Sequence, residues 1–598
     1  MIPPEEASPD VLEPDPSYPP EPSPYAARPW LASYPPGVPA DFDFPEVPLT
    51  RLLDDAAASF PSRTALAFLG LTMTYRELRD AADHLASGLA GLGVRRADRV
   101  SVVLPNCPQN VLTVFAVLRL GGVVVQHNPL SPASELRAQL ADCGARVVVC
   151  LDRVHDVVAG IRADTAVHSL VVTSLADYVP ARTRLRTRLP LPSARRARDR
   201  LSAPLRPDAS TVPFLRLVKT PTAARQTPVD PRRDPAVLHY TGGTTGSPRA
   251  AVLTHDNLVS NAYMNRLWDT GGTAGGEVTI GVLPLFHAYG MTVCLNATVL
   301  LAGTLVLLPH LDVEELFAAV DRWRPTMLPA VPTVFRALTE GPQARLHDLS
   351  SLRVCVSGAM RLPLDVQEQF ERLSGALLVE GYGLTETSPS THCNPLSEQR
   401  RPGTIGLPLP GTQCRVVDPD DASRDVPVGS PGELLVRGPQ VFQGYWGSDE
   451  RPFTDDDWLL TGDLVVMDAD GFFRVVDRKK DVVISGGFNV SPSEVEDVLS
   501  SLPGVADCVV VGVPDRYLGE RVKAYVVRAP GHRLTEADVI AGCAALLATY
   551  KVPRSVEFRE ELPRTPVGKV RRRQLVEEER AAPTSDEPGR KTPRPDGR

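Results

Sequence analysis

Short apolar runs alternate with segments of helical periodicity over two long parts of the chain. In the first part, strands are predicted at residues 99–104, 123–126 and 146–150, and helices at 109–119 and 135–142. In the second part, a helix is predicted at 313–323, and strands are predicted at 278–283, 304–308, 327–330, 353–357 and 377–380. Apolar strands separated by amphipathic helices are typical of βαβ units. The pattern therefore predicts an α/β fold whose layers are built on parallel sheets.

The hydrophobic pattern changes twice in the last third of the chain. Between residues 403 and 478, short apolar runs separated by Gly, Pro and Asp predict a small β-barrel-like subdomain. From residue 480 a compact α+β unit is predicted, with elements at 492–500, 507–511, 523–527 and 536–548. We therefore expect an N-terminal domain at residues 26–479 and a smaller C-terminal domain at residues 480–577.

The composition narrows the class of protein. A chain of 598 residues is too long for a single hydrophobic core, and 43% apolar with 23% charged residues is typical of a soluble globular protein. The net charge of −8 gives no general attraction to nucleic acid. Both ends, residues 1–25 and 578–598, are rich in proline and charge and are expected to be disordered.

Two features bear on the compartment. The nine cysteines form no C-x-x-C pair, which favours a reduced, cytoplasmic protein, and the N-terminus lacks the basic and apolar regions of a signal peptide. The longest apolar segment, 291–308, contains Asn296 and Thr298 and is interrupted by Gly303. We therefore expect a buried helix, a cap at Gly303 and then a strand, instead of a membrane span.

Residues 181–206 stand apart because nine arginines are crowded among leucines. The interpretation that we favour is a solvated, flexible insertion. The alternative is a basic patch that touches anionic lipid, which would place the protein at the inner face of the membrane. A nucleic-acid tail is disfavoured, because no aromatic residue is interleaved with the arginines.

A loop rich in glycine and threonine follows the short apolar run at 236–238. Glycine lets the backbone approach a ligand closely, and successive N–H groups with Thr hydroxyls form an anion-binding concavity. No Gly-Lys-Ser/Thr follows at the Walker A spacing. The stretch therefore predicts a different kind of phosphate-binding loop, with donors at Thr241, Gly242, Gly243, Thr244, Thr245 and Gly246.

Residues 240–250 resemble the phosphate loop of the adenylate-forming superfamily, which includes acyl-CoA synthetases, peptide-synthetase adenylation domains and firefly luciferase. Further stretches match the same family in the same order, at 381–387, 461–463, 477–480, 485–489 and 566–569. Residues 28–31, 380–389 and 486–494 are most similar to bacterial long-chain fatty-acyl-CoA synthetases. The loop departs from the family at Arg249 and Ala250, where Lys-Gly is usual.

The resemblance implies a two-step reaction. A medium- to long-chain fatty acid would react with ATP to give acyl-AMP and pyrophosphate, and CoA would then displace AMP to give acyl-CoA. The small domain is expected to be mobile and to rotate about Lys480. The rotation would bring first Lys569, and then Ser485, Gly486 and Gly487, to the reacting groups. Lys569 would offset the charge on the α-phosphate and carboxylate in the transition state.

The resemblance also implies roles for side chains around the nucleotide. Thr244 and Glu386 are the expected Mg²⁺ ligands, because Mg²⁺ prefers hard oxygens. Tyr382 is expected to stack on adenine, and Asp463 and Arg478 to hold the ribose. The remaining nucleotide-binding positions implied by the resemblance are Gly358, Ala359, Glu380, Gly381, Gly383 and Thr385.

Three sequence features keep alternatives open. Thr245 and His287 are candidate catalytic residues, but His287 would equally fit as a structural histidine, and residues 286–301 as an acyl tunnel or plain core. Arg249 is expected to hold pyrophosphate through its planar fork of donors.

Two other functions are weighed, a fatty-acyl-AMP ligase that loads a carrier protein and a non-catalytic membrane-associated interaction protein. The oligomeric state is open, with a homodimer as one outcome.

Overall fold

The computed structural model describes residues 23–221, 223–241, 249–340, 342–515, 517–565 and 568–581. Most of the two expected disordered ends lies outside these residues, and so do Gly242, Gly243, Thr244, Thr245 and Gly246 of the predicted phosphate loop. The described ends are more ordered than the sequence predicted. Tyr25 is buried and donates its hydroxyl to Val426 O at 2.9 Å, and helix α16 (Arg572–Ala581) continues past the expected boundary at 577.

The first sheet is mainly parallel, as the alternating pattern predicted. Its strands lie in the order β7 (Thr211–Pro213), β6 (Ser169–Thr173), β5 (Val147–Leu151), β3 (Arg99–Val103), β4 (Val123–Gln126), β8 (Pro235–Thr241) and β9 (Arg249–Thr254). Only β9 runs antiparallel to its neighbour. The connecting helices include α3 (Pro108–Arg119), α4 (Ala133–Cys143) and α5 (Asp152–Ile161). Every residue of α3 is buried, because the two large sheets enclose this helix.

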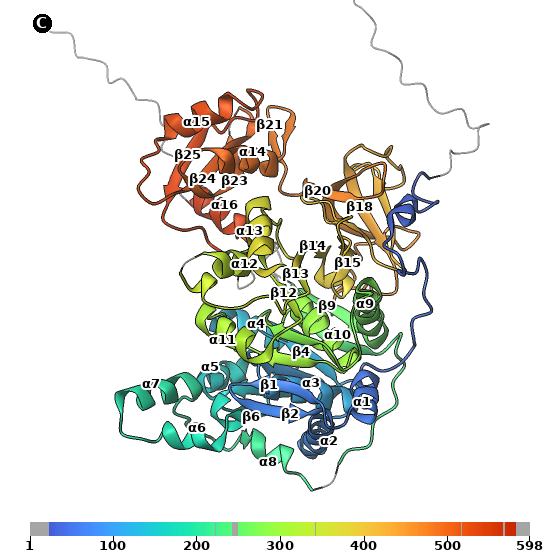
Figure 1. The fold of residues 1–598 in the computed structure, drawn as a ribbon, viewed down its shortest axis with the longest axis vertical. Coiled ribbons are helices and arrows are strands. Elements are labelled where there is room, and N and C mark those ends of the chain that lie inside the picture. Colours follow the sequence, from blue (N-terminus) through green and yellow to red (C-terminus); the bar gives the residue numbers. More distant parts are fainter. Residues whose placement is uncertain are drawn as a thin grey trace, which may run out of the picture.

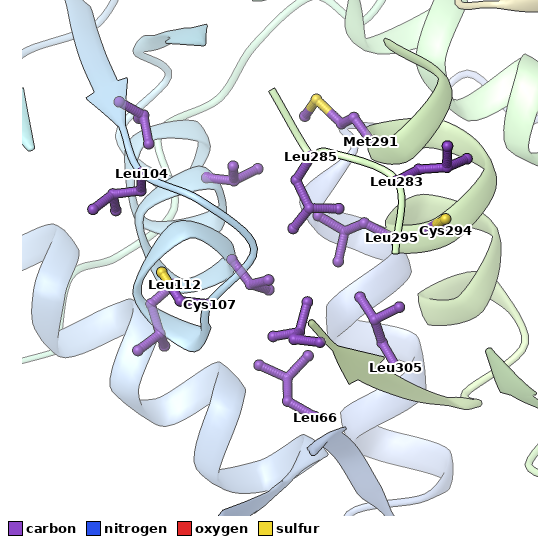
Figure 2. Close-up of a cluster of buried hydrophobic side chains, with 14 of the residues drawn as sticks. Leu66, Leu104, Cys107, Leu112, Leu283, Leu285, Met291, Cys294, Leu295 and Leu305 are labelled. Carbon is purple, nitrogen blue, oxygen red and sulfur yellow. The ribbon is translucent and has the colours of Figure 1, made fainter. Parts of the chain in front are cut away.

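The second sheet has a parallel centre and antiparallel edges. Its strands lie in the order β16 (Leu407–Pro408), β15 (Ser390–Cys393), β14 (Leu377–Gly383), β13 (Val354–Ser357), β12 (Met327–Ala330), β10 (Val278–Gly281), β11 (Thr304–Leu307), β1 (Thr64–Phe68) and β2 (Leu71–Thr74). Around it lie α1 (Thr50–Ser59), α2 (Tyr75–Gly91), α9 (His255–Trp268), α11 (Val313–Trp323), α12 (Pro332–Thr339) and α13 (Leu364–Ser374). Figure 2 shows Leu112 of α3, and Cys107 just before this helix, facing Leu66, Leu295 and Leu305 across the buried core.

The apolar segment at 291–308 folds nearly as predicted. A buried π-helix (Gly290–Asn296) continues into α10 (Ala297–Leu300), and β11 follows. The cap is one residue earlier than expected, since Ala302 takes the left-handed conformation at φ 48°. Gly303 serves another need, because a Cβ there would lie 2.9 Å from Glu277 O. No helix within the described residues has the length and apolar character needed to cross a bilayer.

The β-rich segment forms a small subdomain with a four-stranded sheet. Its order is β17 (Gln413–Val417), β18 (Gly432–Arg437), β19 (Leu459–Met467) and β20 (Phe473–Arg478), all antiparallel. Among the described residues, no backbone pairing joins β17 to β20. The chain just before β17 does pair with β20, since Ile405 N donates to Phe473 O at 2.8 Å and Phe473 N donates to Gly406 O at 2.9 Å, which agrees with the predicted barrel-like arrangement.

The C-terminal unit is an α+β domain with a core of its own. Five strands, β21 (Val483–Ser485), β22 (Phe488–Val490), β23 (Val505–Asp515), β24 (Gly519–Arg528) and β25 (Ser555–Arg559), form one sheet. Helices α14 (Pro492–Ser501), α15 (Glu536–Ala544) and α16 cover it, and α15 ends earlier than the predicted helix at 536–548. Figure 1 shows this domain above helices α12 and α13 of the larger domain.

The arginine-rich segment, for which a solvated, flexible insertion was expected, is partly helical. It forms α6 (Ala181–Arg186) and α7 (Pro192–Leu201), which project from the lower left of the body in Figure 1. All nine of its arginines are solvent-exposed, as a solvated segment requires. The short helix α8 (Phe214–Val218) then returns the chain to the core through buried Phe214.

Candidate active site

One large cleft is lined by residues of the large α/β domain, of the four-stranded sheet β17–β20 and of the C-terminal domain. Its volume is about 2810 Å³, well above the range of about 300–1,000 Å³ that is usual for small-ligand sites. The carboxyl ends of β8, β13 and β14 reach it, which is where ligands bind in open α/β sheets. The predicted residues that line it are Thr241, Arg249, His287, Gly358, Ala359, Glu380, Gly381, Tyr382, Gly383, Thr385, Glu386, Asp463, Arg478, Lys480 and Lys569.

The ends of the predicted phosphate loop are held together at this cleft. Thr241 ends β8, Arg249 begins β9, and the two residues face each other in the antiparallel register. Thr241 Oγ1 donates to Arg249 O at 3.3 Å. Ala250 is buried in the extended strand and accepts a bond from Trp446 N at 2.8 Å, so the backbone freedom of glycine is not required there.

Asp463 is a buried carboxylate that two side chains fix from different directions. It is 2% exposed and lies opposite Arg478 in the register of β19 and β20. Tyr382 Oη donates to Asp463 Oδ2 at 2.6 Å, and Arg478 forms an ion pair with Asp463, with 3.0 Å between Nε and Oδ1. The charge of Asp463 raises the pKa of Arg478, and burial raises the pKa of Tyr382. The carboxylate is therefore preorganised to accept further bonds from hydroxyl groups.

Glu386 follows β14 in a short 3-10 turn, Thr385–Thr387. Its carboxylate Oε1 accepts the hydroxyl of Tyr445 at 2.8 Å, and its backbone carbonyl accepts Phe442 N at 2.9 Å. No described residue donates to the other carboxylate oxygen, Oε2. A hard oxygen on the wall of the cleft, beside the ends of the phosphate loop, fits a Mg²⁺ ion that retains several waters.

Tyr445 is a site residue that the sequence analysis missed. It lies in the cleft wall, and the guanidinium carbon of Arg249 lies 5.5 Å from the centre of its ring. Arg249 itself forms a two-pronged ion pair with Glu450, at 3.0 and 2.9 Å. The signal was weak, because a tyrosine some sixty residues after Glu386 carries no motif that connects the two.

Lys569 reaches the cleft from the C-terminal domain. A tight turn presents it, with Thr565 N donating to Lys569 O at 2.8 Å and with Gly568 at φ 82°. A Cβ on Gly568 would lie 3.0 Å from Met360 Cε of the larger domain, so glycine permits this close approach. The surrounding protein lowers the pKa of Lys569, and so does the charge of Arg478, although the side chain remains accessible to solvent.

Ser485, Gly486 and Gly487 do not meet Lys569 in this conformation. They form the turn between β21 and β22, with positive φ angles of 60° and 84° at the two glycines. None of the three lines the cleft, and the neighbouring Phe488 is 54% exposed. The structure therefore brings the predicted catalytic lysine to the site and leaves the predicted CoA segment outside it.

Two histidines lie at or near the wall of the cleft, His239, which is buried, and His287, which is half-buried. Burial, with the charge of Lys569, lowers the pKa of His287 to about 4, so its imidazole is neutral at pH 7. His239 was not among the predicted site residues. Its Nδ1 lies 3.2 Å from Phe286 O, and its Nε2 has no partner among the described residues. A neutral His287 is able to orient a carboxylate by one hydrogen bond, without adding charge.

The wall formed by β13 and β14 contains an acid that is neutral at pH 7. Glu380 faces Ser357 in the register of these strands, and burial raises its pKa to about 8. Next to it the backbone passes Tyr289 closely, since a Cβ on Gly358 would lie 2.8 Å from the tyrosine ring. Ala359 follows with φ 69°. This wall is closely packed.

One part of the cleft is apolar. The side chains there come from the π-helix, from α10 and from the neighbouring strands, and they include Leu283, Val293, Ala297, Leu301, Met327, Val354 and Val356. Three of them belong to the segment 286–301, for which an acyl tunnel and plain core were both considered. Because these side chains line the cavity, the segment does more than fill the core.

The comparisons with known proteins agree with this geometry. A family model described as "AMP-binding enzyme" matches residues 53–446, and one described as "AMP-binding enzyme C-terminal domain" matches residues 494–569. The chain is 39% identical to a long-chain-fatty-acid–CoA ligase of Bacillus subtilis (strain 168), covering 92% of this chain and 98% of that protein. A ligase of the same name from Yersinia pestis is 37% identical, covering 93% and 99%.

A solved structure extends the likeness to three dimensions. The crystal structure of ATP-bound MatB from Rhodopseudomonas palustris superposes with a TM-score of 0.76 at 30% identity, covering 89% of this chain and 99% of that one. The match spans both domains, and the predicted resemblance is thereby confirmed. The chain belongs to the AMP-binding enzyme family of adenylate-forming ligases.

Proposed function

We propose that this protein is an ATP-dependent fatty acid–CoA ligase that acts through an acyl-adenylate. The observation that carries the proposal is the meeting of Lys569, from the C-terminal domain, with Glu386 and Asp463 in one cleft that also has an apolar part. The names of the curated relatives support long-chain fatty acids as the substrate class. CoA consumption should be measured across fatty acids of increasing chain length. A preference for medium or long chains supports the proposal, and no consumption with any chain contradicts it.

In the first step, a carboxylate oxygen of the fatty acid attacks the α-phosphorus of ATP, and the bond to pyrophosphate breaks. The acyl chain lies in the apolar part of the cleft, and Asp463 accepts hydrogen bonds from the ribose hydroxyls. Lys569 contacts the carboxylate and the α-phosphate, where negative charge accumulates. Neutral His287 orients the attacking carboxylate, and the phosphate loop donates to the departing pyrophosphate.

Glu386 would hold the metal ion, together with Thr244, which lies outside the described residues. Mg²⁺, when bound, supplies charge neutralisation for the phosphate oxygens. Tyr382 lies with its hydroxyl fixed by Asp463 and its ring edge-to-face with His392, at 5.8 Å between ring centres. That fixed ring offers adenine a face to pack against, as the sequence resemblance implies.

In the second step, the thiol sulfur of CoA attacks the acyl carbonyl carbon, the thiol proton is lost, and the bond to AMP breaks. Rotation about Lys480 would withdraw Lys569 and carry Gly486 and Gly487 to the cleft. Both glycines already hold positive φ angles, and a Cβ added to Gly487 would have no atom outside the local chain within 4 Å. The turn is therefore narrow enough for the pantetheine arm to pass its backbone.

Transfer to a carrier protein is the rival outcome of the second step. It would use the same adenylate and the same first step, so the adenylation cleft does not distinguish the two. Incubation of the protein with fatty acid, ATP and either CoA or a purified acyl carrier protein separates them. We expect thioester only with CoA, and thioester only with the carrier would replace the proposed acceptor.

We also propose that the protein contacts anionic membranes peripherally through α6 and α7. Their segment, 181–206, carries nine arginines and one acidic residue, Asp199, on a chain whose net charge is −8. Among the described residues, only Arg198 of these arginines lies within 4.0 Å of a carboxylate. Exposed Leu185, Leu189 and Leu191 add apolar contact, which suits a bilayer better than a nucleic acid.

Sedimentation with vesicles tests this contact. The full-length protein should pellet with phosphatidylglycerol-containing vesicles and remain in solution with pure phosphatidylcholine. Replacing Leu185, Leu189 and Leu191 with serine should weaken the pelleting while the net charge is unchanged. Equal pelleting by this variant and the parent, or equal binding to duplex DNA, would contradict a lipid-specific surface.

A further inference from the structure

Glu386 is held in place by a segment that lies far from it in sequence. Tyr445 donates to its carboxylate Oε1 at 2.8 Å, and Phe442 N donates to its backbone carbonyl at 2.9 Å. The Tyr445 ring packs edge-to-face on Phe442, with 5.0 Å between ring centres. The carboxylate is thus bound at one oxygen, and the other oxygen remains for a ligand on the cleft side.

The same segment is attached to the strand that follows the phosphate loop. Tyr445 pairs with Ala251 in an isolated antiparallel bridge, Val252 N donates to Gly444 O at 3.0 Å, and Trp446 N donates to Ala250 O at 2.8 Å. Because these bonds join backbone atoms, the position of Tyr445 depends on β9. Glu386 and the end of the phosphate loop are therefore fixed relative to each other through one tyrosine.

Arg249 supports Tyr445 from the loop side. Its guanidinium carbon lies 5.5 Å from the centre of the tyrosine ring, and both its terminal nitrogens bind the carboxylate of Glu450. The planar fork of arginine matches a carboxylate with two parallel bonds and also stacks on an aromatic face, which lysine does less well. The side chain that replaces the usual lysine thus has two partners in the same segment, Tyr445 and Glu450, and one of them, Tyr445, donates to Glu386.

We propose that Tyr445 is a positioning residue for Glu386, and that Arg249 and Glu450 act on the metal site only through Tyr445. This inference rests on the proposed function, because it assigns Glu386 to the Mg²⁺ of Mg–ATP. The Tyr445 hydroxyl fixes the rotation of the carboxylate, so that Oε2 faces the metal without further loss of side-chain freedom. Residues that orient a metal ligand typically contribute about 10–100-fold to metal affinity or activity.

Calorimetric titration of the full-length protein with ATP, without fatty acid, gives a readout that does not need turnover. Each protein is titrated once in excess Mg²⁺ and once in EDTA. Tyr445→Phe should weaken ATP binding about tenfold in Mg²⁺ and leave it unchanged in EDTA. Phenylalanine retains the ring that packs on Phe442 and Arg249, so the thermal midpoint should stay near that of the parent.

Tyr25→Phe is the matched control. This substitution also removes a hydroxyl that donates to a protein oxygen at 2.9 Å. The acceptor is Val426 O, which lies away from the cleft. This variant should bind ATP like the parent in both buffers. If Tyr25→Phe and Tyr445→Phe lose the same affinity, or if Tyr445→Phe loses as much in EDTA as in Mg²⁺, the positioning role is wrong.

A double-mutant cycle separates the indirect role of Arg249 from direct phosphate binding. If Arg249 acts through Tyr445, Arg249→Ala weakens ATP binding only in Mg²⁺ and has no additional effect in the Tyr445→Phe protein. If Arg249 binds phosphate directly, the loss appears in both buffers and adds to that of Tyr445→Phe, which overturns this part of the inference. A parent protein that binds no ATP in Mg²⁺ would instead overturn the proposed function.

Discussion

Tyr382 and Asp463 join two sheets at the edge of the cleft, with the tyrosine hydroxyl 2.6 Å from Asp463 Oδ2. Tyr382 belongs to β14 of the nine-stranded sheet, and Asp463 belongs to β19 of the four-stranded sheet. Arg478, opposite Asp463 on β20, binds the other carboxylate oxygen. A single buried carboxylate therefore links the cleft side of the large domain to the strand that leads to Lys480, the proposed hinge.

Asp463→Ala should raise the KM for ATP without unfolding the protein. Hydrogen bonds to a charged group contribute about 1.5–3 kcal/mol, which corresponds to about 10–150-fold in affinity. Steady-state kinetics with ATP as the varied substrate measure the change, and the far-UV spectrum checks the fold. Asp463→Asn keeps the shape of the side chain and should show a smaller increase. A KM equal to that of the parent would remove Asp463 from the nucleotide site.

Lys569→Ala should abolish acyl-adenylate formation but spare thioesterification of added acyl-AMP. The reason is that Lys569 lies in the cleft while Ser485, Gly486 and Gly487 lie outside it, so the conformation that contains Lys569 serves only the first step. Both half-reactions are followed separately by pyrophosphate release and by acyl-CoA formation. Lys219→Ala, which removes an exposed lysine away from the cleft, is the control. Equal loss in both half-reactions would contradict the division of roles.

The rate of adenylation should fall at alkaline pH. The fall should begin at a lower pH than the one at which an ordinary lysine loses its proton. The surrounding protein and the charge of Arg478 lower the pKa of Lys569 from 10.5, and only the protonated amine can offset phosphate charge. The kcat/KM for ATP reports the free enzyme and is the quantity to follow with pH. Lys569→Arg should move the alkaline limb upward, because guanidinium remains charged. An unchanged limb in that variant would assign the titration to another group.

Glu380→Gln should stabilise the protein increasingly as pH rises. Burial raises the folded-state pKa of Glu380 from 4.5 to about 8. The stability contributed by the neutral carboxyl is therefore complete below 4.5 and is lost as pH rises through about 8. Thermal midpoints of variant and parent should diverge between about pH 5 and about pH 8, with Glu368→Gln on the surface as the control. A difference that is constant with pH would mean that Glu380 ionises normally.

The parallel strands and the large-domain site could be predicted because each rests on local sequence. The apolar runs at 353–357 and 377–380 become β13 and β14, and Glu380, Tyr382 and Glu386 follow from one continuous stretch. Tyr445 could not be predicted, because it meets Glu386 only through backbone pairing of its segment with β9.

Two local errors have different causes. Gly303 looked like a helix cap, but Ala302 takes the left-handed conformation, and Gly303 is needed for its close approach to Glu277. At α6 and α7, the many leucines and arginines favour a helix, because both residue types are good helix formers. The charge of the segment was enough to predict that it is solvated. Its helical conformation could have been predicted only from the helix propensities of its residues.

Product analysis of one reaction tests the central claim most directly. The purified protein is incubated with palmitate, ATP, Mg²⁺ and CoA, and the products are separated by liquid chromatography with mass detection. The account predicts palmitoyl-CoA and AMP in equal amounts, with pyrophosphate and no ADP. Accumulation of palmitoyl-AMP beside unreacted CoA, formation of ADP, or no fatty-acid-dependent product at all would contradict it.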